Sequence, residues 1–164
     1  MSSLFEKAFY GNGGPQPLGI DATRLDKGLW IGSKPEIGRA VGESGFDLLV
    51  LCAEEYQPPS GEFPGVDVIH APFDDNDIGP TSQEKKIARS AAKRVAAAVR
   101  NGSRVLVSCI AGRNRSGLVC GLALVENGLD PIRALTLIWD KRRYSLTNEA
   151  FVDLLCGSSR IGQP

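Results

Sequence analysis

Several residue types are scarce in this chain of 164 residues, and each scarcity narrows its chemistry. It has one histidine, His70, so a Ser-His-Asp or Cys-His protease mechanism would need that residue as its base. A single histidine also argues against a histidine-rich metal site. The four cysteines form no Cys-x-x-Cys pair and no zinc pattern. We therefore expect no metal and no cofactor.

Long apolar runs and an excess of charge of one sign are also missing. No run reaches the roughly 18–20 apolar residues of a membrane span, and neither a signal peptide nor a lipidation motif is present. Lys+Arg and Asp+Glu are balanced at 19 each, so no global field attracts nucleic acid or an anionic membrane. We expect a cytoplasmic protein with reduced cysteines and neither a membrane nor a nucleic acid partner.

The length and the pattern of apolar runs predict a single α/β domain. Residues 1–20, rich in Gly, Pro and Gln, indicate an N-terminal arm, and the domain is expected over 21–164. Strands are predicted at 28–32, 46–52, 66–73 and 104–109, and helices at 36–45, 81–100, 116–125, 131–143 and 148–156. This alternation favours a mainly parallel sheet of four to five strands flanked by helices. Ligands of such sheets bind beyond the carboxyl ends of the strands.

One predicted strand runs directly into a cysteine, in "RVLVSCIAGRNRSG". Cys109 is followed after five residues by Arg115, a spacing that by itself arises by chance in roughly one such chain in five. The surroundings strengthen it, because a strand precedes the loop, Gly112 permits a tight turn and a helix begins near Ser116. An inert core thiol is the plain alternative for Cys109. Two arginines at a helix start disfavour it, since they repel the helix dipole and need an anion.

Such a loop is suited to binding a phosphate. Its backbone N–H groups and the helix dipole converge on one point, and Arg115 offers a bidentate fork for phosphate oxygens. The same positive field favours the thiolate of Cys109, which would attack the phosphorus and form a cysteinyl-phosphate. We expect phosphate, sulfate or vanadate to bind in this loop. The residues expected to line it are Ile110, Ala111, Gly112, Arg113 and Asn114.

The reaction also needs an acid for the leaving oxygen and a base for water, and one carboxylate can serve as both in turn. The loop "PFDDND" after the neighbouring strand supplies Asp74, Asp75 and Asp77. Ser116 is placed to hydrogen-bond the thiolate and help it leave. The second arginine, Arg113, either adds charge for a polyanionic substrate or points into solvent. The segment "DKRR" at 140–143 is predicted to be a solvated helix end.

These motifs resemble the cysteine-dependent protein phosphatases, in particular the dual-specificity branch. "CIAGRNRSG" is similar to the Cys-x5-Arg-Ser signature of that family, and "APFDD" is similar to its acid loop. The resemblance covers roughly residues 25–156 and implies that Asp75 is the general acid and that Asn148 braces the phosphate loop. "PFDD", "CIAG", "GLALVENG" and "KRR" most resemble the phosphatases of regenerating liver. That subgroup implies a redox partner for the nucleophile, which here would be Cys52.

The chain departs from its relatives at three points. Ser108 stands where the family usually has histidine before the nucleophile. Ser116 is the residue of the wider family, whereas the regenerating-liver subgroup has alanine there. The basic, prenylated tail of that subgroup is missing from this sequence.

The resemblance implies a metal-independent phosphomonoester hydrolase acting on phosphotyrosine, phosphoserine or phosphothreonine proteins. Phosphoinositide and RNA 5′-phosphate substrates are alternatives, the second because "GRNRSG" resembles the loop of RNA triphosphatases. A non-catalytic phosphate-binding module is a further alternative. The presence of Cys109, Arg115, Ser116 and Asp75 together argues against that module. A sulfur-transfer or arsenate-reducing enzyme is disfavoured by the order of the cysteine and acid loops.

Overall fold

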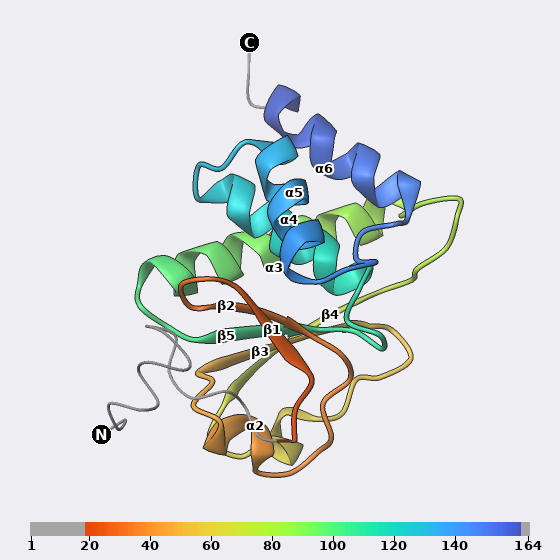
Figure 1. Cartoon of the computed structure of the whole chain (residues 1–164). Coiled ribbons are helices and arrows are strands. Elements are labelled where there is room, and N and C mark those ends of the chain that lie inside the picture. Colours follow the sequence, from red (N-terminus) through yellow and green to blue (C-terminus); the bar gives the residue numbers. More distant parts are fainter. Residues whose placement is uncertain (1–18, 162–164) are drawn as a thin grey trace.

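The structure, a computed structural model, describes residues 19–161, with side chains described as far as Gly157. Nearly all of the predicted N-terminal arm therefore lies outside the described residues. Strands and helices alternate along the chain (Figure 1). The elements are β1 (Ala22–Asp26), β2 (Leu29–Gly32), α2 (Ala40–Glu43), β3 (Leu48–Ala53), the short 3₁₀ helix η2 (Ser60–Glu62), β4 (Asp67–Phe73), α3 (Ser82–Arg100), β5 (Val105–Ser108), α4 (Arg115–Glu126), α5 (Pro131–Lys141) and α6 (Glu149–Ile161).

The five strands form one sheet in the order β1-β2-β5-β3-β4. Strands β2, β5, β3 and β4 are parallel to one another, and β1 pairs with β2 in the antiparallel direction. The mainly parallel sheet is as predicted, but strand β1 was not expected. Its sequence, ATRLD, has only two fully buried residues and no continuous apolar run, because it lies at an edge of the sheet.

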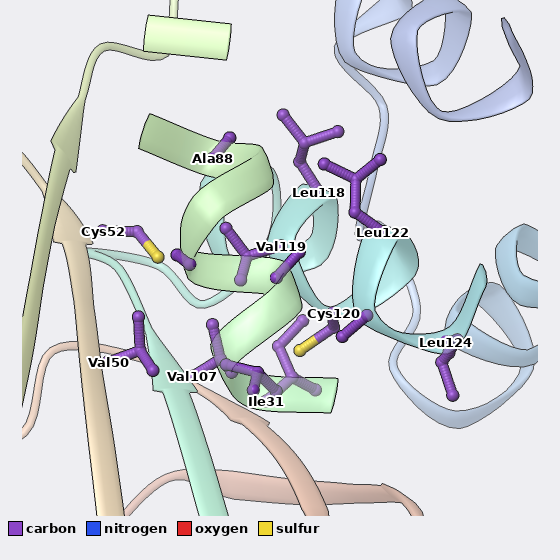
Figure 2. Close-up of a cluster of buried hydrophobic side chains, with 14 of the residues drawn as sticks. Ile31, Val50, Cys52, Ala88, Val107, Leu118, Val119, Cys120, Leu122 and Leu124 are labelled. Carbon is purple, nitrogen blue, oxygen red and sulfur yellow. The ribbon is translucent and has the colours of Figure 1, made fainter. Parts of the chain in front are cut away.

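The main core lies between the sheet and the layer of helices α3 to α6. Figure 2 shows Ile31, Val50 and Val107 of the strands facing Val119 and Cys120 of α4, all five at 0% exposure. A smaller cluster on the opposite face, beside α2, joins Trp30, Phe46, Leu49, Phe63 and Leu106. Burial on both faces explains why the central strands read as continuous apolar runs.

The helices keep most of their predicted limits. Helix α3 begins with a capping box, in which the Thr81 hydroxyl accepts from the Glu84 N–H and the Glu84 carboxylate accepts from the Thr81 N–H. Helix α2 spans only four residues of the ten expected. Helix α5 starts after the N-cap Asp130 and ends at Lys141. Within the described residues, no helix combines the length and the apolarity needed to cross a bilayer.

Candidate active site

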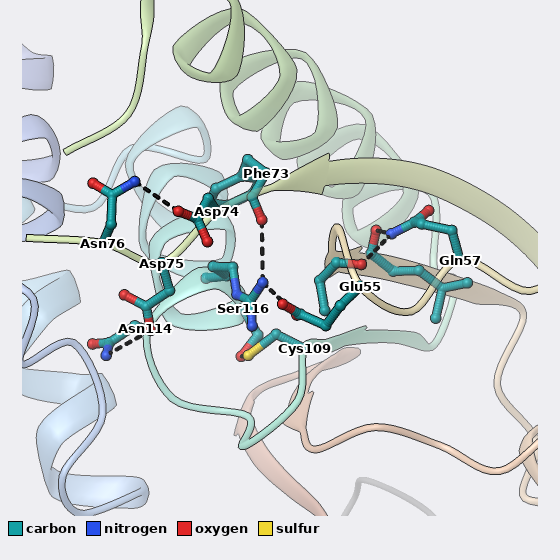
Figure 3. Close-up of polar contacts among 12 residues, drawn as sticks. Glu55, Gln57, Phe73, Asp74, Asp75, Asn76, Cys109, Asn114 and Ser116 are labelled. Carbon is teal, nitrogen blue, oxygen red and sulfur yellow. Dashed lines mark hydrogen bonds and ion pairs between the residues drawn. The ribbon is translucent and has the colours of Figure 1, made fainter. Parts of the chain in front are cut away.

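The Cys109 thiol lies at the carboxyl end of the central strand β5, as predicted. It is 5% exposed, and its Sγ is 3.2 Å from the Oγ of Ser116 (Figure 3). Ser116 is the second residue of helix α4, so the loop between β5 and α4 folds back over the thiol. The strand end and the first turn of the helix thus place a hydroxyl against the sulfur.

The backbone N–H groups of the loop between β5 and α4 are a second feature of the site. Gly112 has φ +67°, and a Cβ at this position would lie 2.4 Å from the carbonyl carbon of Gly32, so only glycine fits. The Cys109 N–H donates to the Gly32 carbonyl, and the Ile110 carbonyl accepts from the Lys34 N–H. Among residues 19–161, no acceptor is found for the backbone N–H groups of residues 110–114. These donors are free to bind an anion.

Arg115 is buried beside this loop, with its side chain 8% exposed. Its Nη1 donates to the Phe73 carbonyl at 3.2 Å and forms an ion pair with the Glu55 carboxylate at 2.5 Å. Its Nε is buried and has no hydrogen-bond partner among the described residues. Phe73 ends β4 and Glu55 follows β3, so two strand ends fix the guanidinium. Sequence reasoning did not identify Glu55, because no local motif marks it.

Asp75 is held by two amide side chains. Its Oδ1 accepts from Asn148 Nδ2 at 2.8 Å. Its Oδ2 accepts from Asn114 Nδ2 at 3.1 Å (Figure 3). The Oδ1 of Asn114 in turn accepts from the backbone N–H groups of Thr147 and Asn148. The side chain of Asn148 was expected to brace the phosphate loop. Among the hydrogen bonds of the described residues, this side chain donates to Asp75 and to the Asn76 carbonyl of the acid loop, and the Asn148 backbone N–H donates to Asn114 of the phosphate loop.

The acid loop is also tied to the start of helix α3. The Asp74 N–H donates to the Glu84 carboxylate at 2.7 Å. This bond, followed by the bond from the Thr81 N–H, lowers the pKa of Glu84 below its ordinary value. Asn76 adds internal bonds, donating to the Asp74 carboxylate and accepting from the Gly79 N–H.

Residues 140–143 form an exposed helix end, as predicted, with one exception, Arg142. Its side chain is 13% exposed, and its guanidinium donates to the Gly112 carbonyl at 2.7 Å and to the Ala111 carbonyl at 3.3 Å. It also binds both carboxylate oxygens of Asp21 and the Thr23 hydroxyl. The arginine therefore joins the phosphate loop to strand β1. The partners lie about 30 and 120 residues away, so no sequence pattern shows them.

The segment between α5 and α6 packs on the phosphate loop. Leu146 is fully buried, and its N–H donates to the Arg113 carbonyl at 3.1 Å. Tyr144 and Leu146 both have positive φ, 63° and 50°, which is unfavourable for residues with a side chain. Such strain persists only where surrounding contacts impose it, and here those contacts include the candidate site.

The predicted redox partner, Cys52, lies one residue past the pairing of Leu51 with Ser108, which places it opposite Cys109 on the neighbouring strand. Burial, reinforced by the nearby charges of Cys109 and Cys120, raises the pKa of the Cys52 thiol well above its usual range. All four cysteines are free. The buried Ser108 hydroxyl donates to the Val50 carbonyl, so its hydrogen bond joins two strands.

Three further predictions concern charged or metal-binding groups. Arg113 is exposed, and its side chain has no hydrogen bond or ion pair within the described residues. His70 is exposed on β4, where its Nε2 is 2.8 Å from the Pro58 carbonyl. Residues 19–161 contain no cluster of three His, Cys, Asp or Glu side chains that could hold a metal ion.

Comparisons with known proteins point to one superfamily. No family model matches the chain. Mouse (Mus musculus) protein tyrosine phosphatase type IVA 3 is 31% identical over 101 residues, which cover 60% of this chain and 56% of that protein. The match therefore spans little more than half of the relative's length. It agrees with the regenerating-liver resemblance in pointing to the cysteine-dependent phosphatases.

Solved structures match over most of the chain. Tk-PTP, in a mutant form, superposes with a TM-score of 0.72 and 25% identity, covering 87% of this chain and 98% of its own. Human DUSP28 (TM-score 0.68, 24% identity, 89% and 97% covered) and PTPMT1 in complex with PI(5)P (0.71, 20%, 86% and 99%) share the fold. The α/β sheet described above thus has a dual-specificity phosphatase-like fold, and together with the curated relative these matches make the chain similar to the cysteine-dependent protein tyrosine phosphatase superfamily.

Proposed function

We propose that this protein hydrolyses phosphomonoesters through a cysteinyl-phosphate intermediate, with phosphorylated proteins as substrates. The observation that carries the proposal is the position of the Cys109 thiol. It lies beside the Ser116 hydroxyl and the buried Arg115, in a loop whose backbone N–H groups at residues 110–114 have no acceptor among residues 19–161. A phosphate bound by these donors would present its phosphorus to the sulfur.

In the first step, the Cys109 thiolate attacks phosphorus, so that an S–P bond forms and the bond to the leaving oxygen breaks. Asp75 in its protonated form gives its proton to that oxygen. In the second step, water attacks the phosphorus while the Asp75 carboxylate takes a proton from it. The S–P bond breaks, and the released thiolate accepts a hydrogen bond from Ser116. The Asn114 and Asn148 amides hold Asp75 for both steps.

Arg115 binds the phosphate oxygens in this scheme, and Glu55 holds the guanidinium when no phosphate is bound. The buried, unpartnered Nε of Arg115 gives the phosphate a donor that no described residue uses. Neutralisation of the phosphate by the loop and by Arg115 replaces the charge that a metal ion would supply.

The first test is hydrolysis of p-nitrophenyl phosphate and of a phosphotyrosine peptide, measured across pH with EDTA and a reductant. Wild type is expected to turn over both, and Cys109→Ser to turn over neither. Cys156→Ser, at a cysteine distant in sequence from the loop, is the matched control and should keep full activity. Equal inactivity of wild type and Cys109→Ser would overturn catalysis and leave a phosphate-binding module.

Asp75→Ala separates the role of the acid from that of the nucleophile. The loss should be about 100-fold for the phosphotyrosine peptide, within the range of general acid catalysis, and smaller for p-nitrophenyl phosphate. The nitrophenolate leaves with little help from a proton, which explains the difference. Asp77→Ala, on the same loop, should change neither rate. Equal losses on both substrates would contradict the assignment of Asp75 as the acid.

The substrate class is decided by a panel of phosphotyrosine and phosphothreonine peptides, a phosphoinositide and an RNA with a 5′-phosphate. The proposal expects the highest kcat/KM for a peptide. A higher value for the inositol lipid or for the RNA would overturn the protein substrate while leaving the mechanism intact.

A further inference from the structure

A groove outside the catalytic pocket runs between strand β4 and helix α3. It has a volume of about 300 Å³. Helix α3 lines it with residues on one face, spaced three and four apart, and β4 lines it with three consecutive residues. The lining residues are Ile69, His70, Ala71, Gln83, Lys86, Ile87, Ser90, Ala91 and Arg94. None of the residues used in the catalytic scheme is among them.

Strand β4 forms one edge of the sheet and pairs only with β3 among the described strands. Its outer backbone groups therefore face the groove without a neighbouring strand. An exposed edge of this kind binds an extended peptide by adding it as a further strand. The strand is seven residues long, which is enough to pair with a short segment.

The charge of the groove indicates which kind of peptide segment would bind in it. Lys86 and Arg94 line it, and none of its nine lining residues is a carboxylate. Neither cation forms an ion pair within residues 19–161. Helix α3 has six Lys or Arg residues and one Glu, although the whole chain is balanced at 19 charges of each sign. Two of these six cations, Lys86 and Arg94, thus lie beside the open strand edge.

The groove leads toward the candidate active site. Ala71 in the groove precedes Asp75 by four residues, a stretch of at most about 14 Å. The start of helix α3, where Gln83 lines the groove, is bonded to the acid loop through Glu84. A chain lying in the groove is therefore within a few residues' length of the acid loop.

We propose that this groove docks an acidic, extended segment of the phosphoprotein substrate, which pairs with β4 and places its carboxylates against Lys86 and Arg94. The proposal rests on the proposed function for its substrate class. Backbone pairing supplies affinity with little sequence preference, and the two cations select for acidic segments. The groove then determines which phosphoproteins reach the active site.

The test compares phosphotyrosine peptides that differ only in a distal segment. A six-residue, glutamate-rich segment is joined to the phosphotyrosine core by a Gly-Ser linker, at either end, and a glutamine version is the control peptide. The acidic segment should raise kcat/KM about tenfold at low salt, through KM, and the gain should fall as salt rises. No gain with either attachment would overturn the proposal.

The double variant Lys86→Glu/Arg94→Glu should lose this gain, whereas Lys93→Glu, an exposed residue of α3 outside the groove, should keep it. All three proteins should hydrolyse p-nitrophenyl phosphate at the same rate. If Lys93→Glu loses the gain equally, the effect comes from the general charge of the helix, and the groove is not a docking site. N-methylation of alternate amides in the acidic segment should also remove the gain, and a full gain would exclude strand pairing.

Two further measurements distinguish a failure of the docking proposal from a failure of the proposed phosphatase function. Fluorescence anisotropy with the unphosphorylated acidic peptide reports docking even if no phosphatase activity is found, so the groove can be tested without the proposed function. Sedimentation with phosphatidylserine vesicles tests the competing partner. Binding to vesicles but not to the peptide, lost in the double variant, would assign the groove to a lipid surface and overturn the proposal.

Discussion

At the residue scale, Asn114 connects the phosphate loop to the acid. Its amide N–H donates to Asp75, and its carbonyl oxygen accepts two backbone N–H groups from residues 147 and 148. A residue with both donor and acceptor is required for this position. Asn114 therefore couples the orientation of the acid to the loop that binds the phosphate.

We predict that Asn114→Ala lowers kcat for a phosphotyrosine peptide about tenfold, because a misplaced acid transfers its proton less well. The loss should vanish in an Asp75→Ala background, since the two residues act through one group. A double-mutant cycle on kcat measures this coupling. Equal losses in both backgrounds would show that Asn114 acts on stability alone, which the thermal midpoint of each variant reports separately.

A second prediction at this scale concerns Cys52. Neighbouring strands lie about 4.8 Å apart, within the Cα separation that a disulfide bridges. Peroxide oxidises the Cys109 thiolate to a sulfenic acid, and the Cys52 thiol then displaces water from it to form a disulfide. The pKa of Cys52 is raised, so this second step should accelerate as pH rises.

Intact-mass analysis after mild peroxide should show the loss of two hydrogens, reversible by a thiol reductant. Cys52→Ser should instead accumulate sulfinic acid, whereas Cys156→Ser should behave as wild type. A stable sulfenic or sulfinic acid in wild type would refute the pairing.

The sequence predicted the residues of the catalytic scheme because their relations are mostly local. Cys109, Ser116 and Arg115 are fixed by one strand, one turn and one helix start. Glu55 and Arg142 were missed, since their contacts join distant segments. The difference is physical: a turn determines its own geometry, whereas an ion pair across the fold depends on packing that no short motif encodes.

At the scale of elements, the capping box of α3 is the clearest contribution of sequence to stability. The Thr81→Ala variant loses the side-chain acceptor for the Glu84 N–H and should lower the free energy of unfolding by about 1 kcal/mol. Urea denaturation measures this, with Ser82→Ala as the control. An unchanged urea midpoint in Thr81→Ala would contradict the prediction, as would an equal shift in the control.

Most elements were predictable, and the exceptions lie at the edges of the fold. The buried strands β3 and β5 were visible as apolar runs, and helix α3 was marked by its cap. Strand β1 was not predicted because its apolar and polar residues do not alternate regularly. Among the described strands, it pairs only with β2.

At the scale of the whole molecule, Arg142 joins β1, the phosphate loop and helix α5. The Arg142→Ala variant should lose about 2 kcal/mol of stability, because several hydrogen bonds, two of them part-buried, disappear together, and kcat/KM should fall as the loop loosens. The Arg142→Lys variant should keep little of this stability or activity, since an ammonium cannot make the paired hydrogen bonds that the guanidinium makes to the two carboxylate oxygens of Asp21. Urea denaturation and peptide kinetics measure the two effects. Wild-type kinetics in Arg142→Ala would contradict a positioning role.

The contact between Arg142 and Asp21 also predicts that the stability of the fold depends on pH in the acidic range. Hydrogen bonding to Arg142 lowers the pKa of Asp21 from its ordinary 3.8, so the stabilisation is present above that value and is lost as pH falls through the lowered pKa. Urea midpoints measured from pH 6 to pH 2 should fall more steeply for wild type than for Arg142→Ala. Parallel curves would mean that Asp21 contributes nothing to acid stability.

The contacts of Arg142 and Asn148 also bear on the order in which the chain is synthesised. A ribosome completes Cys109 and Arg115 well before it adds the residues that hold the Gly112 carbonyl and the Asp75 carboxylate. A nascent chain at that stage would already have its thiol and its arginine, but the loop and the acid would lack their supports. Competence would then arrive only after residues 142–148 have been synthesised and have docked against the loop and the acid.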